Sequence, residues 1–88
     1  MLLAPGRRQM MPAISVHRPG VPREDFVTTE GEEFVLVLDG TIELEFVDGS
    51  SYSLRKGDSA YYSAVEPHRV RVTGKDPAEV VVVATPPW

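Results

Sequence analysis

An uninterrupted apolar run, Phe34-Val35-Leu36-Val37-Leu38, constrains the fold of this chain more than any other feature. A strand that is apolar on both faces must be covered on both sides. Asp39-Gly40 follows the run directly, and Asp-Gly between two β-type runs indicates a type I′ hairpin, which needs positive φ at both central residues. Beyond it, Ile42, Leu44 and Phe46 alternate with polar residues, as expected of a strand with one solvent-facing side. The stretch therefore predicts a hairpin at the centre of a β-protein.

Other short β-type runs recur between turn signals. Further strands are predicted at 13–17, 26–29, 52–54, 60–62, 68–73 and 80–83. No window shows the 3.6-residue period of a helix. About eight short strands separated by turns favour an all-β sandwich or barrel. An immunoglobulin-like sandwich is the alternative, but it lacks support because there is no buried central tryptophan and no disulfide.

The chain has 88 residues and no cysteine. This length predicts one domain, with residues 1–11 as a tail without pattern and residues 12–88 as a single barrel domain. Such a chain buries only about 60–65% of its unfolded surface. Without cysteine it has no disulfide to stabilise the fold, and it also has no thiolate nucleophile. Because Val80–Val83 is also apolar on both faces, we expect a second copy to cover these strands in a homodimer.

Charge is distributed unevenly along the sequence. Residues 1–23 contain four arginines and no acid, whereas residues 24–88 contain all 13 acids. The basic arm could touch nucleic acid, but packing on an acidic body is favoured, so no direct nucleic-acid binding is expected. No apolar run approaches the roughly 20 residues that span a bilayer. We therefore expect a cytoplasmic protein without a membrane segment.

Reactive side chains are few, and His17 and His68 are the only histidines. His68 shares the apolar face of its strand with two valines, and Glu33 shares a face with two valines of the central run. If both faces line one interior, a carboxylate and an imidazole meet in an apolar lumen. That pair is either a functional site or a satisfied polar pair near the mouth of the barrel. Tyr62 either lines a ligand pocket or packs in the core or an interface.

Several short motifs resemble those of the cupin family. Glu33 followed after six residues by Gly40, then Gly57-Asp58 and Pro67-His68, is similar to the two cupin motifs. The likeness is greatest to the small cupin domains that follow helix-turn-helix domains in bacterial regulators, and it covers about residues 13–86. It implies a double-stranded β-helix, which is a small jelly-roll barrel.

The resemblance also implies a metal site that is only partly present. Glu33 and His68 match two of the family's four typical ligands, but the two remaining histidine positions fall on Val27 and Thr29. A catalytic metal generally has three protein ligands. We therefore expect no tightly bound cofactor, and at most weak binding of zinc, nickel, iron or manganese.

Other residues could replace the missing ligands. Glu30 or Glu32 would have to reach the site from their loop. His17 could be recruited only if the first strand crosses the barrel mouth, and it is expected at the surface or an interface instead.

Three functions follow, in descending order of support. The first is a small-molecule-binding module, sensing or regulatory, without its own DNA-binding domain. Its candidate ligand-binding residues are Glu33, His68, Thr29 and Tyr62. The second is a metal-dependent dioxygenase or isomerase with a degenerate metal site. The third is a metal-free enzyme with Glu33 or His68 as general base, so whether the chain is an enzyme stays open.

Overall fold

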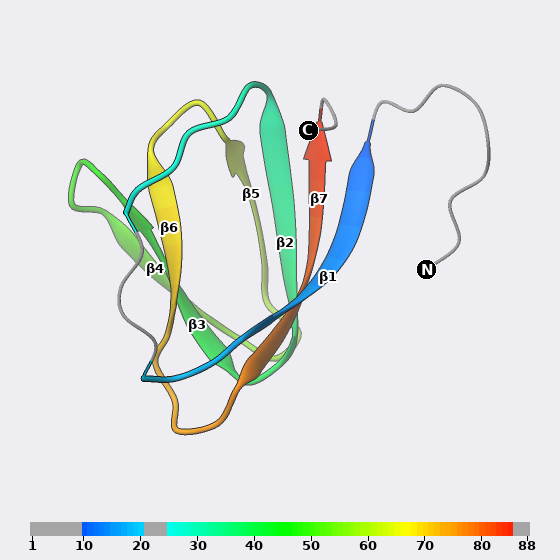
Figure 1. Ribbon diagram of the computed structural model, residues 1–88, viewed down its shortest axis with the longest axis vertical. Coiled ribbons are helices and arrows are strands. Elements are labelled where there is room, and N and C mark those ends of the chain that lie inside the picture. The colour runs from blue at the N-terminus through cyan, green and yellow to red at the C-terminus, as the bar shows by residue number, and fades with distance from the viewer. Residues whose placement is uncertain (1–9, 21–24, 86–88) are drawn as a thin grey trace.

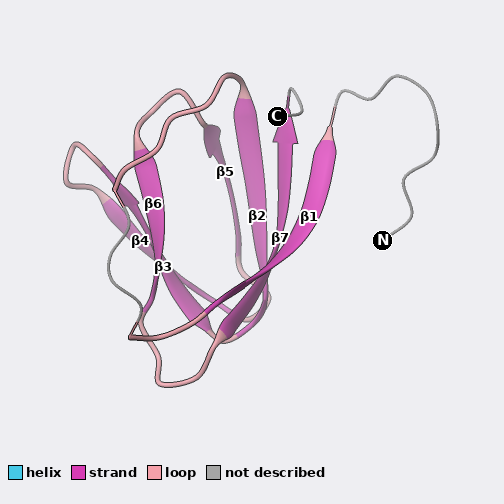
Figure 2. Cartoon of the chain, in the orientation of Figure 1, coloured by secondary structure: helices cyan, strands magenta, loops and turns pink. Residues whose placement is uncertain are grey.

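The computed structural model describes residues 10–20 and 25–85, which form seven β-strands. They are β1 (Met11–His17), β2 (Glu32–Asp39), β3 (Thr41–Phe46), β4 (Ser51–Arg55), β5 (Ser59–Ser63), β6 (His68–Val72) and β7 (Ala78–Thr85). In this part of the chain there are strands and loops but no helix (Figure 2), and hence no helix long and apolar enough to cross a membrane. The predicted all-β class is confirmed.

The strands form two antiparallel sheets that face each other (Figure 1). The four-stranded sheet has the order β1-β7-β2-β5, and the three-stranded sheet has the order β4-β3-β6. A single antiparallel bridge between Val27 and His68 joins the segment before β2 to β6. A cavity can therefore form between the inner faces of the sheets.

Branched aliphatic side chains from both sheets fill the core between them. The largest fully buried side chains are Ile42, Leu44, Val35, Val37 and Val80. The predicted inward face of residues 42–46 is confirmed, and Phe46 completes it as a half-buried ring. Each buried side chain of this size contributes roughly 1.5–3 kcal/mol to folding.

The predicted Asp39-Gly40 hairpin is wrong. β2 and β3 follow each other in sequence, but they belong to different sheets. Gly40 has a φ of 82°, while no described non-glycine residue has positive φ, so a type I′ turn is not formed. A Cβ on Gly40 would lie only 2.8 Å from the Cα of Ala78. The glycine therefore makes a corner between the sheets, where the chain passes directly against the start of β7.

The strand predicted at 26–29 is also wrong. Only Val27 pairs with a strand in this segment. Its N–H donates to the His68 carbonyl at 2.8 Å, and its carbonyl accepts from the His68 N–H at 2.9 Å. Thr28 and Thr29 bond instead to the turn after β5: the Thr28 hydroxyl donates to Val65 O, and the Thr29 N–H donates to Ala64 O. The segment thus crosses from one sheet to the other. The remaining predicted strands overlap β1 and β4 to β7.

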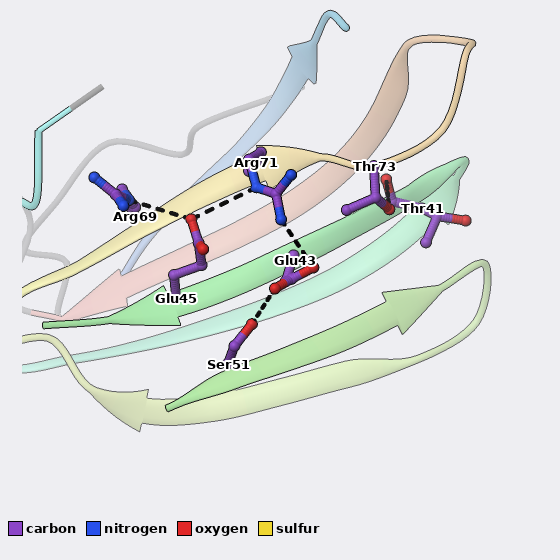
Figure 3. Close-up of polar contacts among 7 residues, drawn as sticks. All are labelled: Thr41, Glu43, Glu45, Ser51, Arg69, Arg71 and Thr73. Atoms are coloured by element: carbon purple, nitrogen blue, oxygen red, sulfur yellow. Dashed lines mark hydrogen bonds and ion pairs between the residues drawn. The ribbon is translucent and has the colours of Figure 1, made fainter. Parts of the chain in front are cut away.

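The outer face of the three-stranded sheet carries alternating charges (Figure 3). Arg71 Nη2 lies 3.1 Å from a Glu43 carboxylate oxygen, and Arg69 Nε lies 3.2 Å from Glu45. The Ser51 hydroxyl also donates to Glu43. These partly exposed pairs contribute roughly 0–1 kcal/mol each. Their main effect is to keep this face polar.

Most of the basic arm, residues 1–23, lies outside the described residues. Arg7, Arg8 and Arg23 lie outside the described residues, and so does most of the predicted tail at 1–11. Arg18 is described, and its side chain is exposed. The packing of the arm on acidic surface and the domain boundary at residue 12 stay predictions.

Candidate functional site: a cavity between the sheets

Glu33 lies near the start of β2 and points between the sheets. Its alternation with Val35 and Val37 turns it inward, and only 8% of it is exposed. One carboxylate oxygen, Oε1, accepts a hydrogen bond from the Tyr62 hydroxyl at 3.2 Å. The other, Oε2, lies 3.3 Å from His68 Nε2 and 3.5 Å from the Thr29 hydroxyl. The structure thus brings together the four predicted ligand-binding residues.

His68 is the first residue of β6, and it faces two hydrogen-bond acceptors. Its Nδ1 lies 2.8 Å from the backbone carbonyl oxygen of Glu66. A carbonyl oxygen can only accept, so Nδ1 carries a proton. Nε2 faces Glu33. When Glu33 is ionised it can only accept, and the ring then satisfies both partners as an imidazolium.

The protonation equilibria of the pair follow from this geometry. The hydrogen bond from His68 lowers the pKa of Glu33, and this effect outweighs burial, which raises it. The hydrogen bond to Glu33 raises the pKa of His68, against burial, which lowers it. Burial and the Glu33 charge raise the pKa of Tyr62, so its hydroxyl stays protonated and acts as a donor.

Aromatic rings support this polar group from one side. The Tyr62 ring packs edge-on against His68, with centroids 5.2 Å apart, and against Phe46, with centroids 5.7 Å apart. Tyr61, the next residue, points to the opposite face of β5 and is 71% exposed. Of the two readings of Tyr62, lining a pocket and packing in the core, the structure shows both.

A cavity of about 210 Å³ opens beside the pair. Its apolar wall is formed by Ala13, Val27, Val35, Val70, Val80 and Val82. Glu33, Tyr62 and His68 contribute polar groups to the lining. The cavity is therefore mostly apolar, with the hydrogen-bonded Glu33–His68 pair in its wall.

His17 also lines this cavity, which differs from its expected place at the surface or an interface. It is half-buried at the end of β1, on the inward face that it shares with Ala13 and Ser15. The alternation in 13–17 was visible in the sequence, but the pairing of β1 with β7 was not. Asp25 and Arg69 line the cavity as well, and the sequence analysis missed both.

The described residues do not fit a complete metal site. No group of three or more His, Cys, Asp or Glu side chains in 10–20 and 25–85 could hold a metal ion. Glu30 and Glu32, the proposed substitutes, are exposed rather than directed to the pair. Glu33 and His68 supply two ligands, and Thr29 and Tyr62 add only neutral hydroxyls. A catalytic site generally needs three ligands.

Comparison with known families identifies the chain. The model of the cupin domain matches residues 14–84, and the chain belongs to this family. A search of curated proteins gave no match. The jelly-roll fold expected from the sequence motifs is thereby confirmed.

Solved structures show the same fold. The Cupin_2 domain of an XRE-family transcriptional regulator from Enterobacter cloacae is 20% identical with a TM-score of 0.78, covering 91% of this chain and 84% of that one. Ectoine synthase from P. lautus is 22% identical with a TM-score of 0.74, covering 91% and 56%. The iron(II) form of HppE, in complex with a substrate, is 23% identical with a TM-score of 0.75, covering 86% and 45%. The chain thus spans about half the length of these two, and the likeness concerns the fold alone.

Proposed function

We propose that this chain binds a small molecule in the cavity between its sheets, as a sensing or regulatory module. The observation that carries the proposal is the placement of the Glu33–His68 pair in the wall of a mostly apolar cavity. Apolar cavities with a few convergent polar groups and perturbed pKa values are typical of ligand sites. The fold that the chain shares with a regulator's cupin domain supports the regulatory role.

The cavity also indicates what kind of ligand fits. At about 210 Å³ it is smaller than most drug-sized pockets, so the ligand is compact. Its aliphatic wall favours an apolar body. The Tyr62 hydroxyl donates to Glu33 and keeps a lone pair, while Ser15, His17, Asp25 and Arg69 add further polar groups to the lining. A compact and mostly apolar molecule with one or two hydrogen-bonding groups matches this lining.

A metal-dependent enzyme is the second candidate. The fold shared with HppE, whose structure contains iron(II), and with ectoine synthase favours it. The side chains described here weigh against it, because they supply two metal ligands rather than three. With a metal bound, Glu33 and His68 would be the residues that hold it.

Ligand binding is tested by a thermal-shift screen of compact alcohols, amines and amides, since a ligand that binds only the folded state raises the melting temperature. Ala13→Leu places extra carbon atoms on the cavity wall, and Ser53→Leu adds a similar group on the solvent face of β4. The proposal expects hits with wild type and Ser53→Leu that disappear with Ala13→Leu. Zinc, nickel and iron are screened in parallel. Hits with metals alone would favour the second candidate, and hits that survive Ala13→Leu would overturn the cavity as the site.

A further inference from the structure

The polar groups that line the cavity lie at different levels along the strands. Glu33 pairs with Ala84 of β7, whereas Ser15 pairs with Val80, four residues away on the same strand. Four residues of a strand span roughly 13 Å. His17 lies two residues beyond Ser15 on β1 and lines the same cavity. The cavity therefore extends along the strands, from Glu33 at one end to Ser15 and His17 at the other.

Between these two ends the inward-facing positions of the four-stranded sheet are aliphatic. Ala13 of β1 pairs with Val82 of β7, which pairs with Val35 of β2, and all three line the cavity. A sphere of the cavity's volume, about 210 Å³, would be only roughly 7 Å across, so a cavity that extends over roughly 13 Å is elongated. An unbranched chain fits this shape better than a ring or a branched molecule.

The end at Glu33 offers hydrogen-bond acceptors to a ligand. Three neighbouring donors already point at the Glu33 carboxylate, namely the hydroxyls of Tyr62 and Thr29 and Nε2 of His68. A ligand group that enters here meets the remaining lone pairs of the ionised carboxylate and of the Tyr62 oxygen. It must therefore donate a hydrogen bond.

The other end carries polar side chains that are open to a partner. Ser15 and His17 are half-buried on the inward face of β1. Within residues 10–20 and 25–85, neither side chain makes a hydrogen bond or an ion pair. A hydroxyl both donates and accepts, and an imidazole also offers hydrogen-bonding nitrogens. This end can thus bind a second polar group of the same ligand.

The charges around the cavity disfavour an anionic ligand. Asp25 lines the cavity and is exposed, so a carboxylate that approaches would be repelled. Arg69 also lines the cavity, but its Nε lies 3.2 Å from Glu45, and its guanidinium carbon lies 4.0 Å from the centre of the Phe26 ring. Its charge is therefore directed to these two side chains, and a neutral ligand suits the lining better than an acid.

We propose, on the basis of the function proposed above, that the ligand is an unbranched aliphatic chain with a hydrogen-bond donor such as a hydroxyl at each end. One end donates to Glu33 and to the Tyr62 oxygen, and the other forms hydrogen bonds with Ser15 and His17. The chain between them packs against the aliphatic wall. A molecule with one polar end leaves Ser15 and His17 without a partner, so a second group at the matching distance adds affinity.

Methyl-resolved NMR titration of the full chain with 1-alkanols and α,ω-alkanediols of about three to ten carbons tests this ligand class. The ratio of diol to alkanol affinity is expected to peak at one chain length, because only that length reaches both ends. His17→Leu and Ser15→Ala are each expected to weaken the best diol roughly 3- to 10-fold, the effect of one hydrogen bond, and to leave the alkanol of equal length unchanged. Dicarboxylates of the same lengths are expected not to bind.

Two matched variants control for indirect effects. Ser53→Ala removes a hydroxyl from the solvent face of β4 and should bind the diol as wild type does. His17→Gln keeps a hydrogen-bonding group and should retain part of the affinity that His17→Leu loses. Circular dichroism and the thermal transition of each variant establish that it folds.

The outcomes separate this ligand class from binding in the cavity itself. A diol-to-alkanol ratio that does not depend on length, or a best diol that binds His17→Leu and Ser15→Ala as tightly as wild type, would overturn the two-ended ligand and leave the cavity as a binding site. A best diol that still binds Ala13→Leu would lie outside the cavity and overturn both. Binding by neither series would also overturn the two-ended ligand, and the proposed function would fall with it if the thermal-shift screen gave no hits.

Discussion

Nε2 of His68 lies 3.3 Å from Oε2 of Glu33, although the two residues belong to different sheets. Because Nδ1 of His68 donates a hydrogen bond to the Glu66 carbonyl, Nε2 is the ring nitrogen that faces the Glu33 carboxylate. The pair therefore links the two layers beside the cavity, so we expect it to affect stability as well as binding.

Stability should depend on pH through this pair. The pKa of His68 is raised on folding. The stability that His68 contributes is therefore complete below its unfolded pKa of about 6.5, and it is lost as pH rises through the folded pKa. The pKa of Glu33 is lowered, so its contribution is complete above its unfolded pKa of about 4.3 and is lost as pH falls through the folded value. Both contributions to stability are therefore complete between about pH 4.5 and 6.5.

Urea unfolding of wild type and Glu33→Gln from pH 3 to 9 measures this dependence. The variant retains every other titrating group, so the difference in free energy of unfolding isolates the pair. That difference is expected to be largest between about pH 4.5 and 6.5 and to shrink on both sides. A difference that is constant with pH would contradict the ion pair.

Tyr62→Phe should destabilise the protein, and Tyr61→Phe should not. The Tyr62 hydroxyl donates to the Glu33 carboxylate at 3.2 Å, and a hydrogen bond to a charged group contributes about 1.5–3 kcal/mol. Tyr61 is 71% exposed on the outer face. Loss of the hydroxyl at 62 should also raise the pKa of Glu33, measurable by carbon-13 shifts of its carboxyl. Equal stability of the two variants would show that the hydroxyl of Tyr62 is not needed.

Gly40→Ala should lower the free energy of unfolding more than Gly57→Ala does. Both glycines have positive φ, 82° and 90°, so each substitution carries a backbone penalty of about 1–2 kcal/mol. Only at Gly40 would the new Cβ meet backbone atoms, with Ala78 Cα at 2.8 Å, whereas nothing lies within 4 Å at Gly57. The difference between the two free energies of unfolding measures this close approach. Equal costs would mean that the corner between β2 and β3 is looser than described.

Thr29→His should add a third metal ligand beside Glu33 and His68. The Thr29 hydroxyl lies 3.5 Å from the Glu33 carboxylate, so an imidazole there would reach the same point as Glu33 and His68. Two imidazoles and one carboxylate suit zinc, nickel or iron. Calorimetric titration with zinc and nickel is expected to show weak binding to wild type and tight binding to Thr29→His.

The control for this site is Thr29→His combined with His68→Ala. It is expected to lose tight binding, because only two ligands remain. Tight stoichiometric metal in wild type would show that another residue completes a natural site. The absence of binding in Thr29→His would contradict the convergence of residues 29, 33 and 68.

Much of the fold was predictable because alternation reports which face a strand buries. The inward positions of Ile42, Glu33 and His68 all followed from a period of two. The Asp39-Gly40 hairpin failed because the signal reports a turn with positive φ, not which strands pair. Gly40 has that φ, but the neighbours of β2 are β7 and β5, distant in sequence.

The candidate site was partly predictable for the same reason. Motif spacing and strand parity together indicated Glu33, His68, Thr29 and Tyr62. The place of His17 depends on β1 lying beside β7, that of Asp25 on the segment that crosses between the sheets, and that of Arg69 on β6. Such long-range placements are set by tertiary packing, which a local pattern does not encode.

The most direct test of the cavity as a binding site is a methyl-resolved NMR titration with a thermal-shift hit. Alternate valines of β7 provide an internal control, since Val80 and Val82 line the cavity while Val81 and Val83 lie on the outer face. The account predicts saturable shifts of the Val80, Val82 and Val35 methyls, with little change at Val81 and Val83. Shifts confined to Val81 and Val83, or no saturable shift at Val80 and Val82, would contradict binding between the sheets.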